Sequence, residues 1–315
     1  MSLTPAAAET LRHALATVVV VPVTPLLADG NPDWAAYATL TRRLIDGGIT
    51  VITPNGNTGE FYALSQAEAR QVLETAAAAC TGQDPKTEVL AGVGHDVTTA
   101  TKAAAHARAA GARMIMVHQP VSPYLSADGW VDYHVAIAEA VPDMGVVLYI
   151  RDPKIGGRHI RRLGKQCPNV VGVKFGVRDM VGFAGVARDA GLGRFTWLAG
   201  LAELTAPGCW AYGARGFTSG LANVAPRISV GMLEALQSGD QPGALRLWAE
   251  CRAFEELRAA DSSADNVSVV KEALAQLGLA RRDVRPPSRL LPDEIRGEIG
   301  KILAGWGLEA QGDQL

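Results

Sequence analysis

Short apolar runs alternate with longer amphipathic stretches along most of this chain, and this rhythm restricts the possible folds more than any other feature. The apolar runs are rich in β-branched residues, which is typical of strands buried on both faces. The eight predicted strands are Thr17–Val23, Thr50–Pro54, Glu88–Val93, Arg113–Val117, Gly145–Tyr149, Val170–Lys174, Phe195–Ala199 and Ala214–Ser219. The predicted helices after them are Asp33–Gly47, Ser65–Cys80, Val97–Ala110, Ala127–Ala140, His159–Gln166, Asp179–Ala190, Glu203–Tyr212 and Pro226–Ser238.

Capping residues support the predicted helix ends. Asp33 and Asp179 stand where an N-cap is expected, and Ser65 has Glu68 three residues later, the pattern of a capping box. Several helical stretches end at a glycine, as at Gly111, just before the next apolar run. The boundaries between predicted helices and strands are therefore marked by local chemistry as well as by periodicity.

Eight strand–helix units in ~220 residues favour a closed (β/α)8 TIM barrel over an open, doubly wound sheet. The open sheet is the structural alternative, but its dinucleotide fingerprint is missing. Gly92-Val93-Gly94 begins a Gly-x-Gly pattern, yet His95 follows and no third glycine comes. We expect an α/β protein with a (β/α)8 TIM barrel.

The pattern changes after Gly239, where helical stretches follow one another without strands between them. These stretches are Ala244–Ala260, Val267–Leu277 and Pro292–Ala304. We therefore expect two parts: a catalytic barrel over residues 1–238, and a C-terminal helical extension over residues 239–315 that packs on the barrel.

Composition narrows the functional classes. The formal net charge of −2 is spread along the chain, without the basic patch that nucleic acids or membrane surfaces require. No apolar stretch approaches the roughly 20 residues that span a bilayer, and the first 15 residues do not have the layout of a signal peptide. The four cysteines are widely spaced, as in a reducing compartment. We expect a cytoplasmic protein with no nucleic-acid or membrane partner.

Lys174 is out of place at the end of an apolar strand. Burial of an ammonium group costs on the order of several kcal/mol unless the group is paired or neutral. A lysine that is neutral near pH 7 is a nucleophile. The preceding strand ends at Tyr149, and in a barrel the carboxyl ends of the strands form the active-site rim. These two residues suggest an active site that forms a Schiff base. The alternatives are a structural lysine paired with a buried acid and a tyrosine of the core.

The loop Gly56-Asn57-Thr58-Gly59-Glu60 follows the second predicted strand onto the same rim. Two glycines around a hydroxyl residue allow a tight turn with inward N–H groups, a nest that suits a carboxylate, although an ordinary turn is the alternative.

Taken together, these motifs resemble the dihydrodipicolinate synthase / N-acetylneuraminate lyase family. The resemblance rests on the loop at residues 56–60, on Tyr149, and on Val171-Gly172-Val173-Lys174, with further similarity over Gly213–Ser219 and Ala222–Pro226. It extends from Val18 to Leu236 in order and spacing. The resemblance implies a (β/α)8 barrel with C-terminal helices, a homo-oligomer (tetramer or dimer), and a lyase that acts on a small-molecule 2-keto acid without a metal or cofactor.

By this resemblance Lys174 forms a covalent imine with the ketone of the substrate and Tyr149 moves protons. Gly56, Asn57, Thr58 and Gly59 would bind the substrate carboxylate. Further candidates for substrate contact, on the same rim, are Arg151, Ser219 and Asn223. Glu60 is interpreted as structural, binding the backbone of its loop. His118 lies on the rim without a His or Cys partner at metal spacing, so no metal site is expected.

Some positions depart from the family pattern. Asn57 stands where the synthase and the lyase usually have a Thr or Ser, and the second tyrosine expected after the fourth strand is shifted to Tyr124. Lys154 occupies the place of a substrate-binding arginine, and the nearest arginine is Arg151. These departures argue against dihydrodipicolinate synthase proper.

The segments Gly59–Leu64, Tyr149–Asp152 and Leu198–Glu203 look more like the 5-dehydro-4-deoxyglucarate dehydratase branch. We therefore expect aldol-type cleavage or condensation, or dehydration, of a sugar-derived acid. The alternatives are dihydrodipicolinate synthase, which joins pyruvate and aspartate semialdehyde, a ligand-binding relative without catalysis, and a metal-dependent barrel enzyme, for which the sequence offers no ligand cluster.

Overall fold

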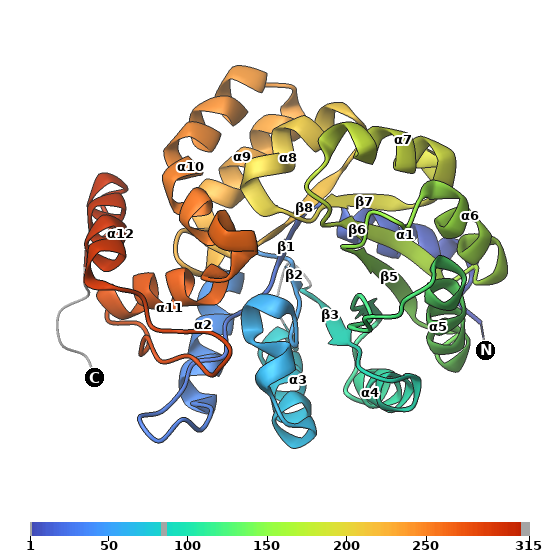
Figure 1. The fold of residues 1–315 in the computed structure, drawn as a ribbon, viewed down its shortest axis with the longest axis horizontal. Coiled ribbons are helices and arrows are strands. Elements are labelled where there is room, and N and C mark those ends of the chain that lie inside the picture. Colours follow the sequence, from blue (N-terminus) through green and yellow to red (C-terminus); the bar gives the residue numbers. More distant parts are fainter. Residues whose placement is uncertain (1, 83–86, 310–315) are drawn as a thin grey trace.

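The computed structural model describes residues 2–82 and 87–309. Eight parallel strands pair in sequence order, and β1 pairs with β8, so that the sheet closes into a barrel (Figure 1). The strands are β1 (Val18–Val20), β2 (Val51–Ile52), β3 (Glu88–Val93), β4 (Met114–Val117), β5 (Gly145–Ile150), β6 (Val170–Phe175), β7 (Thr196–Ala199) and β8 (Gly216–Ser219). The predicted (β/α)8 TIM barrel is confirmed.

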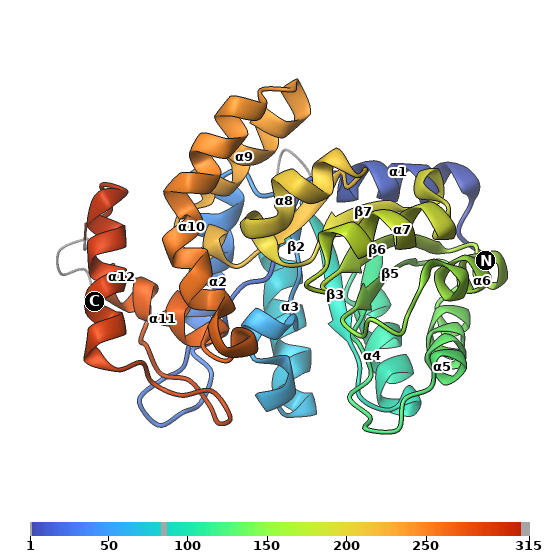
Figure 2. The same cartoon turned by 45° about the horizontal axis from the view of Figure 1, so that its top comes forward.

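Helices alternate with the strands and form the outer layer of the barrel (Figure 2). They are α2 (Trp34–Asp46), α3 (Gln66–Cys80), α4 (Val97–Ala109), α5 (Ala127–Ala140), α6 (Gly157–Gln166), α7 (Met180–Ala190), α8 (Ala202–Ala211) and α9 (Pro226–Ser238). The predicted caps form: Asp33 and Asp179 accept backbone N–H bonds, and Ser65 with Glu68 makes a complete capping box. No helix in the described part of the chain has the length and apolar character needed to cross a membrane.

Strand register brings the two key residues together. Tyr149 on β5 is the register partner of Lys174 on β6, and Lys174 is in turn the partner of Leu198 on β7. Register partners in neighbouring strands point to the same face of a sheet. Tyr149 and Leu198 belong to the apolar cluster inside the barrel, so Lys174 also points to the barrel interior.

An N-terminal helix, α1 (Pro5–Leu15), contacts β6 and β7. Its residues Ala8, Leu11 and Leu15 join the apolar cluster inside the barrel, which the helix therefore caps at the amino ends of the strands. The alternating pattern of the sequence did not predict this helix. Thr4 at its N-cap and Pro5 in its first turn are the local signals that mark it.

Three helices follow the barrel: α10 (Gln241–Ser263), α11 (Asn266–Gln276) and α12 (Asp293–Gly305). Figures 1 and 2 show them gathered on one side, where α10 packs against α8 and α9. Helix α11 contacts two short 3-10 helices on the loops after β2 and β8, η1 (Asn57–Gly59) and η4 (Leu221–Asn223). The extension therefore reaches the carboxyl rim of the barrel. Residues 310–315 of the expected extension lie outside the described residues.

Candidate active site

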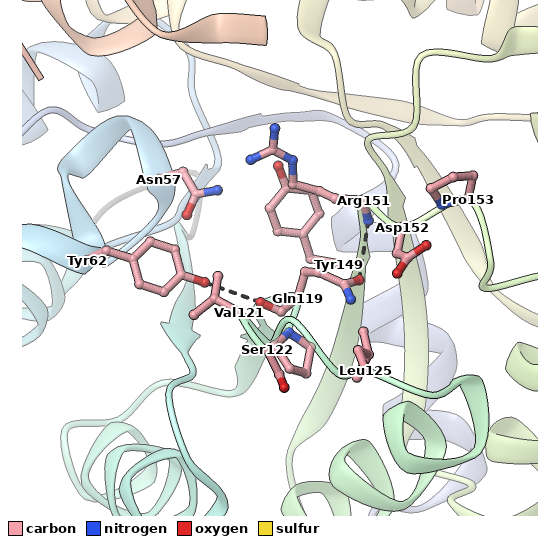
Figure 3. Close-up of a pocket in the computed structure, with 11 residues that line it drawn as sticks. Asn57, Tyr62, Gln119, Val121, Ser122, Leu125, Tyr149, Arg151, Asp152 and Pro153 are labelled. Carbon is pink, nitrogen blue, oxygen red and sulfur yellow. Dashed lines mark hydrogen bonds between the residues drawn. The ribbon is translucent and has the colours of Figure 1, made fainter. Parts of the chain in front are cut away.

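A cavity of about 630 Å³ opens at the carboxyl ends of the strands. Barrel loops form one wall and the C-terminal helices form the other. Its lining includes Asn57, Thr58, Tyr149, Arg151, Lys174, Ser219, Glu255, Arg258 and Asn266. A neighbouring pocket of about 440 Å³ shares Asn57, Tyr62, Tyr149 and Arg151 with it (Figure 3).

Lys174 is the buried amine of this cavity. Its residue is only 5% exposed, and no carboxylate among the described residues forms an ion pair with it. Burial, followed by the positive charges of Arg151 and Arg258, lowers the pKa of Lys174 to about 7. A substantial fraction of the side chain is therefore the neutral amine at neutral pH, the form that attacks a carbonyl carbon.

Tyr149 lies against this amine, with the Lys174 Nζ 4.1 Å from the centre of its ring. Burial raises the pKa of Tyr149, while the charge of Arg151 and the nearby amide of Asn57 act in the opposite direction. Figure 3 shows the Arg151 guanidinium and the Asn57 side chain near the hydroxyl end of the phenol. The tyrosine is thus protonated at neutral pH and can donate a proton beside the amine.

The loop after β2 carries Asn57 and Thr58 on η1. The N–H groups of these two residues have no hydrogen-bond partner in the described part of the chain, whereas those of Gly59 and Glu60 close the turn. Two N–H groups and a buried hydroxyl thus lie at the edge of the cavity, an arrangement suited to a carboxylate.

The glycines of this loop have a different role from the one expected. The positive φ of 61° falls on Glu60, not on a glycine. A Cβ on Gly56 would lie 2.4 Å from the Val21 side chain, and one on Gly59 would lie 2.9 Å from the Pro22 carbonyl oxygen. Neither glycine lines the cavity. They are required because the loop packs closely on the segment after β1.

Glu60 is held by the C-terminal extension rather than by its own loop, which corrects the interpretation from the sequence. Its carboxylate forms an ion pair with Lys271 of α11, and the side chains are 3% and 0% exposed, respectively. The Arg285 N–H donates to Glu60 Oε1 at 2.8 Å, and Lys271 also donates to the Asp283 carbonyl oxygen at 2.9 Å. The extension thus stabilises the conformation of the loop at residues 56–60, which we call the carboxylate loop.

Arg151 presents a guanidinium group to the cavity. That group makes no hydrogen bond or ion pair with the described residues, and the neighbouring Asp152 carboxylate instead accepts from the Lys154 N–H at 2.9 Å. The structure does not contain the local ion pair between Arg151 and Asp152 that the sequence left open. An unpaired guanidinium at a cavity wall is a ready partner for an anion.

Ser219 and Asn223 are committed to other contacts. The Ser219 hydroxyl donates to Glu203 Oε1 at 2.7 Å, although the residue lines the cavity. The Asn223 side chain accepts from the Val23 N–H and donates to the carbonyl oxygens of Val21 and Gly220, and it does not line the cavity. The Asn223 side chain therefore links the loop after β8 to the segment that follows β1.

A group of buried charges at the cavity wall was not predicted from the sequence. Arg258 and Glu255 of α10 form a buried ion pair at the cavity wall. Burial raises the pKa of Glu255 to about 7, and burial also raises the pKa of Glu203. Helical periodicity alone offered little signal, because charged residues on an amphipathic helix ordinarily face water.

His118 and Tyr124 occupy secondary positions. His118 is buried beneath the rim, where its Nε2 lies 2.8 Å from the Asn55 carbonyl oxygen and burial lowers the pKa of the ring to about 3. No three His, Cys, Asp or Glu side chains within residues 2–82 and 87–309 are grouped to hold a metal ion. Tyr124 is 93% exposed and lines neither pocket, so within this chain it does not replace the missing second tyrosine.

Comparison with known proteins gives consistent matches. The model of the dihydrodipicolinate synthetase family matches residues 14–305. A dihydrodipicolinate synthase structure from Bacillus clausii superposes with a TM-score of 0.90 at 38% identity, covering 95% of this chain and 100% of that one. An uncharacterised DapA-like lyase of Halobacterium salinarum is 34% identical over 295 residues, 92% of this chain and 94% of that protein. A probable 5-dehydro-4-deoxyglucarate dehydratase of Pseudomonas entomophila is 30% identical over 240 residues, 75% of this chain and 76% of that protein.

Proposed function

This chain belongs to the dihydrodipicolinate synthetase family and is a lyase of that family, and on this premise we propose that Lys174 forms an imine with the ketone of a 2-keto acid. The observation that carries the proposal is the buried, unpaired amine, with a pKa lowered to about 7, against the ring of Tyr149. A buried amine without a counter-ion destabilises the fold, so its presence in a cavity indicates a functional role.

The chemistry follows from the properties of the imine. The neutral Lys174 amine adds to C2 of the substrate, and the carbinolamine then loses water as Tyr149 transfers a proton to the departing oxygen. The protonated imine draws electrons from C3, so that loss of a C3 proton produces an enamine. Expulsion of the C4 hydroxyl as water then returns those electrons. In the alternative cleavage, the C4 hydroxyl loses its proton and the C3–C4 bond breaks directly from the protonated imine, which releases an aldehyde and leaves an enamine that is protonated at C3. Hydrolysis of the imine finally releases the product and regenerates the amine.

Two regions of the cavity would hold the ends of the substrate. The Thr58 hydroxyl and the N–H groups of Asn57 and Thr58 suit the C1 carboxylate. The unpaired guanidinium of Arg151 suits a second anionic group at the far end of the substrate. The cavity of about 630 Å³ is also much larger than pyruvate requires.

We therefore favour a sugar-derived dicarboxylic 2-keto acid, such as 5-dehydro-4-deoxyglucarate, and a dehydration reaction. The similarity to a probable 5-dehydro-4-deoxyglucarate dehydratase supports this choice. The second candidate is the condensation of pyruvate with aspartate semialdehyde, which is favoured by the 38% identity to the synthase from Bacillus clausii.

Borohydride trapping tests the proposal. The protein is incubated with pyruvate or with aldaric, aldonic and amino-sugar 2-keto acids, reduced, and examined by peptide mass spectrometry. We expect an adduct on Lys174 that is absent from Lys174→Ala. Turnover assays across the same panel then identify the substrate. The absence of any adduct would contradict imine chemistry, whereas saturable binding without turnover, unaffected by Lys174→Ala, would indicate a binding protein.

A further inference from the structure

A line of hydrogen bonds runs from the C-terminal helices to the carboxylate loop. Arg258 of α10 donates from Nε and Nη2 to Asn266 Oδ1, at 3.1 and 2.7 Å. The Asn266 Nδ2 donates to Thr58 Oγ1 at 3.4 Å. At the other end, Arg258 forms its buried ion pair with Glu255. Asn266 thus joins a fixed charge in the extension to the loop proposed to bind the substrate carboxylate.

This line of bonds has one possible direction. A guanidinium has only donors, so the Asn266 carbonyl oxygen must face Arg258 and the amide NH2 must face Thr58. The Thr58 oxygen therefore accepts, and the single hydroxyl proton points elsewhere. No described residue accepts that proton, and Thr58 lines the cavity together with Lys174.

We propose that Asn266 is a positioning residue that directs the Thr58 hydroxyl proton toward the carboxylate of the bound 2-keto acid. The inference rests on the proposed function, because it presumes a carboxylate beside Thr58. It adds a role for the extension in substrate binding. Asn266 acts through Thr58, and its amide orientation is set by Arg258.

Substitution by aspartate separates this role from a merely structural one. In Asn266→Asp the new carboxylate would bind Arg258 more strongly than the amide does, so a structural role predicts a folded and functional protein. That carboxylate has no donor for Thr58 and instead accepts the hydroxyl proton. The proton then turns away from the substrate, and a negative charge lies close to the substrate carboxylate. Asn266→Ala only removes the hydrogen bond that orients the Thr58 hydroxyl, and it adds no charge.

The test measures the pyruvate concentration that gives half-maximal borohydride adduct on Lys174, together with the melting temperature of each full-length variant. We expect Asn266→Ala to raise that concentration about three- to tenfold, as for one lost hydrogen bond. We expect Asn266→Asp to raise it at least about thirtyfold because of the added repulsion, without a lower melting temperature than Asn266→Ala. Arg252→Ala is the control, since Arg252 lies exposed on α10 and pairs with Glu256.

Equal or tighter pyruvate binding in Asn266→Asp than in Asn266→Ala would overturn the inference while leaving imine chemistry intact. A wild-type protein that forms no adduct with any 2-keto acid would overturn the proposed function and this inference with it.

If Asn266→Asp does not fold, a double-mutant cycle of Asn266→Ala and Thr58→Val replaces it. Asn266→Ala should have no further effect on pyruvate binding in the Thr58→Val background, because the proton it directs is absent. Additive effects of the two substitutions would refute the role of Asn266.

Discussion

Replacement of Lys174 by methionine should abolish imine formation and make the protein more stable. The residue is 5% exposed, has no counter-ion among the described residues, and has a pKa lowered from 10.5 to about 7, mainly by burial. Methionine has a similar length and is apolar, so it should fill the same space without a desolvation penalty. The amine that we propose forms the imine is therefore expected to destabilise the fold.

The magnitude follows from proton linkage. Below pH 7 the ammonium is charged in both the folded and the unfolded protein, and its burial lowers the free energy of unfolding by the full desolvation penalty. Between pH 7 and 10.5 the unfolded chain binds more protons, so the stability of the wild type rises with pH. A pKa of about 7 against 10.5 corresponds to a penalty of about 5 kcal/mol at pH 6 and about 2 kcal/mol at pH 9.

Thermal unfolding at the two pH values measures this effect. An unfolding entropy of about 2.1 cal/mol/K per residue over 315 residues converts these penalties to increases in Tm of about 7 °C at pH 6 and about 3 °C at pH 9 for Lys174→Met. The control is Lys102→Met, on the outer face of α4. A Lys174→Met protein that melts at or below the wild-type temperature at pH 6 would refute the reasoning, because the lysine would then be stabilised by a partner.

Three other predictions concern the same site. The rate of imine formation should rise with pH around an apparent pKa of about 7 and level off above it, as measured by stopped-flow trapping with pyruvate; a rise centred near 10.5 would contradict a depressed amine pKa. Arg151→Met should raise the KM for a dicarboxylic 2-keto acid by about tenfold or more, and it should change the KM for pyruvate little. Equal effects on the two KM values would exclude a contact between Arg151 and the second carboxylate. Glu60→Gln or Lys271→Met alone should cost about 3–5 kcal/mol of unfolding free energy, and the double variant much less; additive losses in denaturant titrations would show that the buried pair is not coupled.

The fold was predictable because its signal is local and repeated. Apolar runs such as Val170–Lys174 carry the period and the β-branched residues of a buried strand, and the caps at Asp33 and Ser65 mark where the helices begin. Eight repeats of the same unit leave few topologies. Since all strands of a barrel end at one rim, the sequence also placed Tyr149 and Lys174 together before any contact between them was known.

The hydrogen-bond partners of side chains at the rim were less predictable. Asn223 and Ser219 lie near the expected place, but their polar atoms are bound to loop backbone and to Glu203. Sequence position indicates that a residue reaches the rim, whereas the direction in which its side chain points depends on the neighbouring loops. Arg151 shows the opposite outcome, since its guanidinium is left unpaired at the cavity wall.

By itself, the sequence determined the barrel and the position of Lys174 beside Tyr149 at its rim, because local periodicity and strand order are sufficient to specify them. Only the tertiary structure decided that Lys271 would neutralise Glu60 and that Asn266 would bind Thr58, pairs separated by 211 and 208 residues. No local pattern encodes such contacts. They form because α11 folds back over the carboxyl end of the barrel, where buried charges and amides must find partners from whichever element is packed against them.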